Sequence, residues 1–299
     1  MFAPEGLAPI DGWVVAAILA KAIGYAAALL AMGGPLLLLA FGREIEADRE
    51  ALARFVRRVT AVCALGLLAV LALRFGIRSA RISGSGLDGM TDPTMLGFVW
   101  DSPLGSAAVW RGMGAMLVLL VLVPLRTGLF PAVFGSVLIA VSYAQVGHSL
   151  GEPRWALASL LVVHLLAVAW WIGALPPLHR AAASAHGAAL LQRFGTVATG
   201  VVALLVAVGV TFAWWLAGSP AALLGTAYGW MLLLKVVLVG GLLGLAARNK
   251  LRLVPALAAG DPGAAPFLRR SIAWEGAVVA LILLATATLT TATTPPVKL

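Results

Sequence analysis

The histidines His148 and His164 are the side chains of this sequence best suited to hold a metal ion. A neutral imidazole is a common ligand for copper, zinc or haem iron. His164 stands about eight residues inside a long apolar run, which is roughly 12 Å along a helix at 1.5 Å per residue. His148 ends the preceding run, so the two rings converge only if His148 points inward. A hydrogen-bonded structural role is the alternative for each.

Methionine supplies a second set of soft donors. Met113 and Met116 are three residues apart, so a helix places them near one face. Thioether sulfur favours Cu(I) over harder ions, including Cu(II). His148, His164, Met113 and Met116 are therefore candidate metal-ligating residues, and for the two histidines copper, zinc and haem iron all stay open. Ordinary packing is the alternative for the two methionines.

Four basic residues, Lys21, Arg74, Arg111 and Lys235, lie inside apolar runs. Ionisable residues in a membrane are costly, so each is a candidate functional residue. Arg74 and Lys235 are close enough to the ends of their runs to extend their charges into the interface. Lys21 and Arg111 lie deeper, where a polar partner or an aqueous cavity competes with that explanation.

Glu275 is the acidic residue placed inside a run, near the start of the last one. We expect it to pair with Arg269 or Arg270, because no second carboxylate stands at a spacing suited to acid–base chemistry. The sequence also lacks a nucleotide-binding loop, an HExxH motif and a nucleophile elbow. These absences favour a protein that is not an enzyme.

The elements that must position these residues are membrane helices. The chain has 299 residues, of which 62% are hydrophobic and 11% charged. Its mean hydropathy is +1.01. A soluble domain has roughly half apolar and a quarter charged residues, so a soluble globule or a disordered chain is excluded. Cys63 is the only cysteine, which excludes a disulfide-stapled scaffold.

Eight apolar runs are long enough to cross a bilayer, which takes about 20 residues in a helix. Backbone groups cannot stay unpaired in lipid, and the runs do not alternate as barrel strands do. We therefore predict an all-α bundle of two four-helix halves, 1–147 and 148–299, within one membrane unit. The runs are 13–41, 59–77, 104–125, 130–147, 156–178, 194–218, 230–247 and 273–294.

The net charge of +9 is explained by membrane orientation. Of the 21 basic residues, 13 fall in the loops 42–58, 126–129, 179–193 and 248–272, and four in the opposite set of loops and ends. Positive residues mark the cytoplasmic side. Both termini are therefore expected outside the cytoplasm, and the basic excess meets anionic lipid without any need for nucleic acid.

Several segments of the second half carry a specific pattern. The run His164–Leu178 reads HLLAVAWWIGALPPL, the pair Gly147-His148 ends the previous helix, and Leu223–Gly229 reads LLGTAYG shortly before Lys235. Together these segments resemble the copper resistance D family of bacterial inner-membrane proteins. The resemblance covers about residues 145–296, and the first four runs fit the family in number and hydropathy.

The resemblance implies a multi-pass inner-membrane protein that takes up or transfers copper from the periplasm, often beside a periplasmic copper-binding partner. It makes His148 and His164 the first choice for metal contact, with Trp171, Tyr228 and Lys235 supporting or lining the site. The chain has no Met-rich or His-rich tail and no cysteine pair. A weak, transient copper site fits this better than a tight one, because a transported ion must also leave.

A haem-binding electron-transfer protein is the alternative from another class. His148 and His164 would then be axial ligands. Lys21, Arg111 and Lys235 would meet the propionates. The different depths of the two histidines along their helices count against this geometry.

Overall fold

The computed structural model describes residues 7, 9–48, 50–123, 126–146, 154–184, 187–217 and 220–293. Within these ranges, eight helices are long and apolar enough to cross a membrane, which confirms the predicted all-α bundle. They are α1 (Gly12–Asp48), α2 (Glu50–Ser83), α4 (Pro103–Leu119), α5 (Arg126–Ala144), α6 (Arg154–Ala181), α7 (Gly187–Ala217), α9 (Ala227–Arg248) and α11 (Ala264–Ala292).

Short helices fill several of the connections. In the segment 78–103, between the second and third predicted runs, α3 (Pro93–Trp100) begins after Asp92, which caps it. The Asp92 carboxylate accepts hydrogen bonds from the backbone N–H of Thr94 at 2.8 Å and of Met95 at 3.1 Å. The remaining short elements are η1 (Asp88–Met90), η2 (Leu120–Leu122), α8 (Pro220–Gly225), a π-helical turn (Asn249–Leu253) and α10 (Val254–Ala258).

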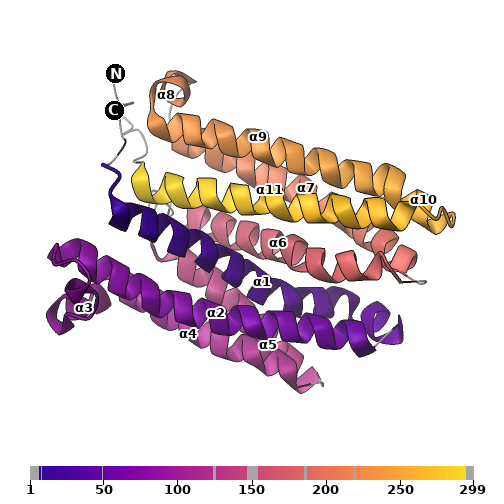
Figure 1. Ribbon diagram of the computed structural model, residues 1–299, viewed down its shortest axis with the longest axis horizontal. Helices are drawn as coiled ribbons and strands as arrows, with labels where there is room; N and C mark the ends of the chain where they lie inside the picture. Colours follow the sequence, from indigo (N-terminus) through magenta and orange to yellow (C-terminus); the bar gives the residue numbers. More distant parts are fainter. Residues whose placement is uncertain are drawn as a thin grey trace.

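The long helices form three layers (Figure 1). The middle layer contains α1, α6 and α11; α2, α4 and α5 lie on one side of it, and α7 and α9 lie on the other. Helix α1 packs against α2, α5, α6 and α11, and α6 packs against α1 and α5 as well as α7. The second half of the chain is thus joined to the first through α6 and α11.

Glycine brings neighbouring helices close together at two crossings, α1 with α6 and α4 with α5. A Cβ on Gly33 of α1 would lie 2.6 Å from the Cα of Gly173 on α6, and a Cβ on Gly114 of α4 would lie 2.8 Å from the Ile139 side chain on α5. No larger side chain fits at these crossings. Small residues are the usual means by which membrane helices pack tightly, because lipid supplies no hydrophobic force between them.

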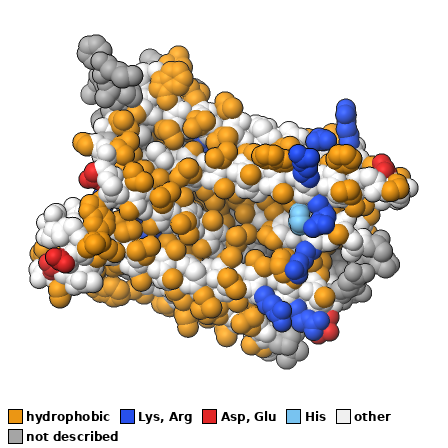
Figure 2. Space-filling view, in the orientation of Figure 1, with side chains coloured by type: hydrophobic (Ala, Val, Ile, Leu, Met, Phe, Trp, Pro, Cys, Tyr) orange, Lys and Arg blue, Asp and Glu red, His pale blue; other side chains and the backbone are white. Residues whose placement is uncertain are grey.

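The two ends of the bundle differ in charge. Leu7 and Thr293 pair through an antiparallel bridge at one end of the bundle, which also carries α3 and α8; we call this the terminal end (Figure 1). Figure 2 shows Lys and Arg side chains gathered toward the opposite end, which carries α10 and which we call the basic end. The loop charges counted in the sequence therefore collect at one end of the folded protein.

Candidate polar sites within the bundle

His164 lies on α6 and faces α7. Its ring meets the ring of Phe212 edge-on, with 6.4 Å between the centroids and 80° between the planes. The ring nitrogen Nδ1 is buried and has no hydrogen-bond partner among the described residues. A buried polar atom without a partner costs free energy, so an unpaired imidazole nitrogen is a candidate metal ligand.

His148, the other predicted histidine ligand, lies outside the described residues. The structure therefore gives no geometry for the pair of histidines. It does give geometry for the remaining residues of the predicted site, on α4, α6 and α9.

The two methionines lie apart from His164. Met113 is 53% exposed and Met116 is 57% exposed, both on α4. That helix packs mainly against α5 and α2, whereas His164 faces α7. The structure thus separates the predicted donors into a buried imidazole on α6 and an exposed thioether pair on α4.

Two of the predicted supporting residues, Trp171 on α6 and Tyr228 on α9, are buried. Trp171 is 9% exposed and Tyr228 is 2% exposed. Trp171 follows His164 by seven residues, so the two share a face of α6 about 10 Å apart along the axis. Lys235 on α9 is close enough to His164 for their charges to interact. Lys235 is therefore the predicted residue that the fold brings into electrostatic contact with His164.

Lys21 and Arg111 both have neutral partners inside the bundle. The ammonium of Lys21 donates hydrogen bonds to the backbone oxygen of Thr290 at 2.9 Å and to the Thr291 hydroxyl at 3.3 Å. The Nε of Arg111 donates to the Ser142 hydroxyl at 3.1 Å. Its guanidinium carbon lies 3.8 Å from the centroid of the Tyr143 ring. A polar partner, rather than extension into the interface, accounts for these two cations.

Glu275 does not pair with Arg269 or Arg270, so that expectation was wrong. Its carboxylate is 4% exposed and accepts a 2.5 Å hydrogen bond from the side-chain amide of Asn249, whereas both arginines are exposed. Asn249 is the functional candidate that the sequence reasoning missed. It lies 26 residues away and comes into contact only because α9 ends in a π-helical turn beside α11.

The described residues hold no group of three or more His, Cys, Asp or Glu side chains placed to bind one metal ion. The one ion pair among them joins Arg54 to Glu50 at 3.8 Å, with both side chains exposed. The described part of the bundle therefore offers one buried imidazole and dispersed neutral donors. Such an arrangement suits weak contact with a soft cation better than a closed metal cage.

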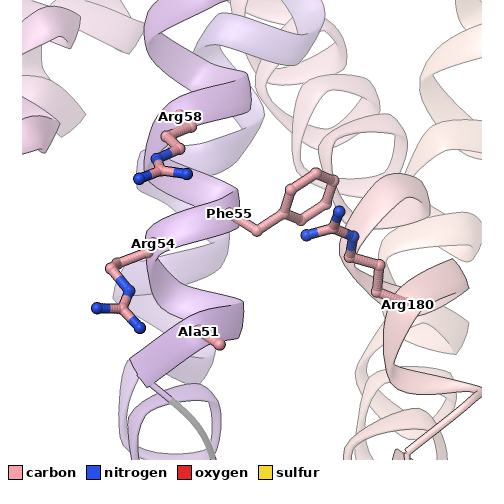
Figure 3. Close-up of a pocket in the computed structure, with 5 residues that line it drawn as sticks. All are labelled: Ala51, Arg54, Phe55, Arg58 and Arg180. Atoms are coloured by element: carbon pink, nitrogen blue, oxygen red, sulfur yellow. The ribbon is translucent and has the colours of Figure 1, made fainter.

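A surface hollow of about 350 Å³ lies at the basic end between α2 and α6, lined by Ala51, Arg54, Phe55, Arg58 and Arg180. Figure 3 shows Arg180 reaching from α6 toward Phe55 of α2, while Arg54 and Arg58 point away from them. The guanidinium carbon of Arg180 lies 3.7 Å from the centroid of the Phe55 ring. This contact ties the two helices together, far along α6 from His164.

Two family models match the chain. The model described as "Copper resistance protein D-like, N-terminal domain" matches residues 10–155, and the model described as "Copper resistance protein D" matches residues 188–289. Together they cover most of the sequence, and the stretch between them contains most of α6. No curated protein and no solved structure matches the chain.

Proposed function

Because the chain belongs to the copper resistance protein D family, we propose that it moves copper ions from the periplasm across or into the inner membrane. Membership confirms the resemblance seen in the motifs, and with the eight apolar helices it makes this a multi-pass membrane protein related to copper resistance. Copper is the substrate of this function. The basic end faces the cytoplasm in the proposal, and the terminal end, with both chain termini, faces the periplasm.

The buried, unpartnered Nδ1 of His164 is the observation that carries the proposal. A neutral imidazole accepts a copper ion through this lone pair. Lys235 on α9 lies within electrostatic range of His164, and in its charged form it would repel a cation bound there. That repulsion weakens binding and favours release, as transfer requires.

The other predicted residues keep separate roles in the proposal. His148 is the second imidazole ligand, and Trp171 and Tyr228 line the path beside α6. Met113 and Met116 form a distinct thioether contact for Cu(I) on the exposed face of α4. The partner that delivers copper is a copper-binding protein of the periplasm. The family matches give no support to the haem alternative.

Cu(I) binding to the purified protein tests the assignment. The protein is reconstituted in lipid nanodiscs, titrated with Cu(I) against a competing chelator, and analysed for bound metal. His164→Ala should weaken Cu(I) binding about tenfold or more, which is about 1.4 kcal/mol. His179→Ala, on the same helix at the basic end, is the matched control and should leave the affinity unchanged.

Two further variants separate the donors. His148→Ala combined with His164→Ala should abolish the imidazole site, and Met113→Leu with Met116→Leu should remove only the second contact. If the double histidine variant binds Cu(I) like the unmodified protein, the histidine site is wrong. If the methionine variant does so, the methionines only pack against lipid.

A further inference from the structure

A carboxyl group is buried toward the basic end of the bundle in a polar cluster that the copper proposal does not use. The cluster consists of Glu275 and Ser271 on α11 and Asn249 at the end of α9, and these side chains are 4%, 4% and 7% exposed, respectively. Ser271 precedes Glu275 by four residues, so both lie on one face of α11.

The cluster has unused hydrogen-bonding capacity. Glu275 accepts a hydrogen bond from Nδ2 of Asn249, but Oδ1 of Asn249 and the Ser271 hydroxyl oxygen are buried without a partner among the described residues. Buried polar atoms are normally paired, and an exception calls for a specific explanation. Here both exceptions lie beside the one buried carboxyl group of the described chain.

No cation within the described ranges forms an ion pair with Glu275. The elements packed against α11 are α1, α6, α9, the π-helical turn and α10. Among the described side chains of these elements and of α11 itself, the ionisable ones at this end are exposed or half-buried: Arg43, His179, Arg180, Arg248, Lys250, Arg252, Arg269 and Arg270. An ionised carboxylate held here would lack the partner that a buried charge requires.

We propose that Glu275 is a proton-binding site that exchanges its proton with the basic end of the bundle. A proton adds to one carboxylate oxygen to give the neutral acid, and its loss restores the anion, so no other reactant is needed. The amide of Asn249 serves both forms: Nδ2 donates to the anion, and after rotation Oδ1 accepts from the acid.

Glu275 lies close along α11 to the exposed start of that helix. Arg270, which is exposed, precedes Glu275 by five residues, or about 7.5 Å along the helix. The Ser271 hydroxyl lies between them in sequence and both donates and accepts hydrogen bonds. The π-helical turn begins at Asn249, and such turns inside helices occur frequently at functional sites.

Infrared spectroscopy of the full chain in nanodiscs tests this site without any copper. The protein should show a carbonyl stretch of a neutral carboxylic acid at neutral pH, where exposed glutamates, with a pKa of about 4.3, are ionised. The band should shift in heavy water, because the proton exchanges. Glu275→Gln should remove it, whereas Glu50→Gln, which alters an exposed acid, should leave it in place.

Asn249→Leu distinguishes a proton site from a merely structural carboxyl. Loss of the amide partner should move the Glu275 band to higher frequency while the protein stays folded, as judged by its circular dichroism. The proposal is overturned if the unmodified protein shows no such band at neutral pH, or if Glu275→Gln retains it. Removal of the band by sodium ions at constant pH would also overturn it, in favour of a metal-cation site.

Discussion

The helices α1, α2, α4, α5 and α6, which we call the tight region, and the layer of α7 and α9 are built on similar apolar composition but pack very differently. Half of the most apolar stretch of α5 is buried inside the protein, against 6% of that of α9. Two pairs of glycines illustrate the difference. Gly33 and Gly114 touch a neighbouring helix, whereas Gly209 of α7 and Gly241 of α9 have open space where a Cβ would stand.

The difference shows that hydropathy alone does not decide which membrane helices pack tightly. Lipid is as apolar as leucine, so close approach depends on small residues and on hydrogen bonds across helices. His164 lies where the two regions meet, on α6 facing Phe212 of α7. A tight region beside a looser layer suits the ion path of the proposed function, because the looser side can yield while the tightly packed helices stay in place.

Removal of a buried tryptophan should produce the largest difference between the two regions. Trp170 on α6 stacks on Phe194 with 4.9 Å between ring centroids, and it is 8% exposed. Trp170→Ala should lower the free energy of unfolding by about 4 kcal/mol, through lost contacts and the cavity left behind. The measurement is equilibrium unfolding in mixed detergent micelles.

Trp230→Ala on α9 is the control for that variant, because Trp230 is 58% exposed. It should change the free energy of unfolding by less than about 0.5 kcal/mol. Equal losses in the two variants would show that α9 is packed as tightly as α6, and the comparison would fail.

Enlarging a glycine should give the next largest effect. Gly33→Leu places a side chain where the backbone of α6 already lies, so we expect a loss of about 3 kcal/mol from overpacking. Gly241→Leu adds the same atoms where nothing stands within 4 Å, and it should be close to neutral. The measurement is thermal unfolding of both variants in one detergent. An unchanged midpoint for Gly33→Leu would contradict the close α1–α6 crossing.

Removal of one hydroxyl should have a smaller effect. Ser142→Ala deprives the buried Arg111 of its hydrogen-bond partner and should cost about 1.5 kcal/mol. Thr211→Val on α7 removes a hydroxyl that bonds only to the backbone of its own helix, at Ala207, and should cost much less. Equilibrium unfolding measures the loss of free energy in each variant. Equal losses would mean that the hydrogen bond from Arg111 to Ser142 does not stabilise the protein.

The eight membrane helices were predictable because each depends on local composition. Their lengths were not, since polar turns at the helix ends continue past the apolar runs, as α2 does from Glu50 to Ser83. The helix α3 was not predicted, although Asp92-Pro93 is a recognisable helix start signal. With eight residues it is too short to cross a bilayer, so a search for membrane-spanning apolar runs does not find it.

The sequence predicts which polar residues are candidates for a site, but not which residues surround them. His164 and Lys21 stood out as costly groups in apolar runs, but their surroundings depend on helices distant in sequence. The Lys21 partner Thr290 is 269 residues away, and no periodicity reports such a pairing. For Glu275, sequence proximity favoured the neighbouring arginines, yet those side chains point to the surface because it is the opposite face of α11 that packs against α9.

The smallest effect on the free energy of unfolding should come from the surface contact between Arg180 of α6 and Phe55 of α2 (Figure 3). Phe55→Leu keeps the side chain apolar but removes the aromatic face beneath the guanidinium, so we expect a loss of roughly 0.5–1 kcal/mol. Phe267→Leu, at a position 59% exposed on α11, is the control. A double-mutant cycle with Arg180→Gln isolates the pair, and a coupling of zero would show that the ring and the cation are only neighbours. A measurable coupling would mean that the tight region is held not only by small residues in its interior but also by a cation–aromatic contact at the basic end, where α2 and α6 meet water.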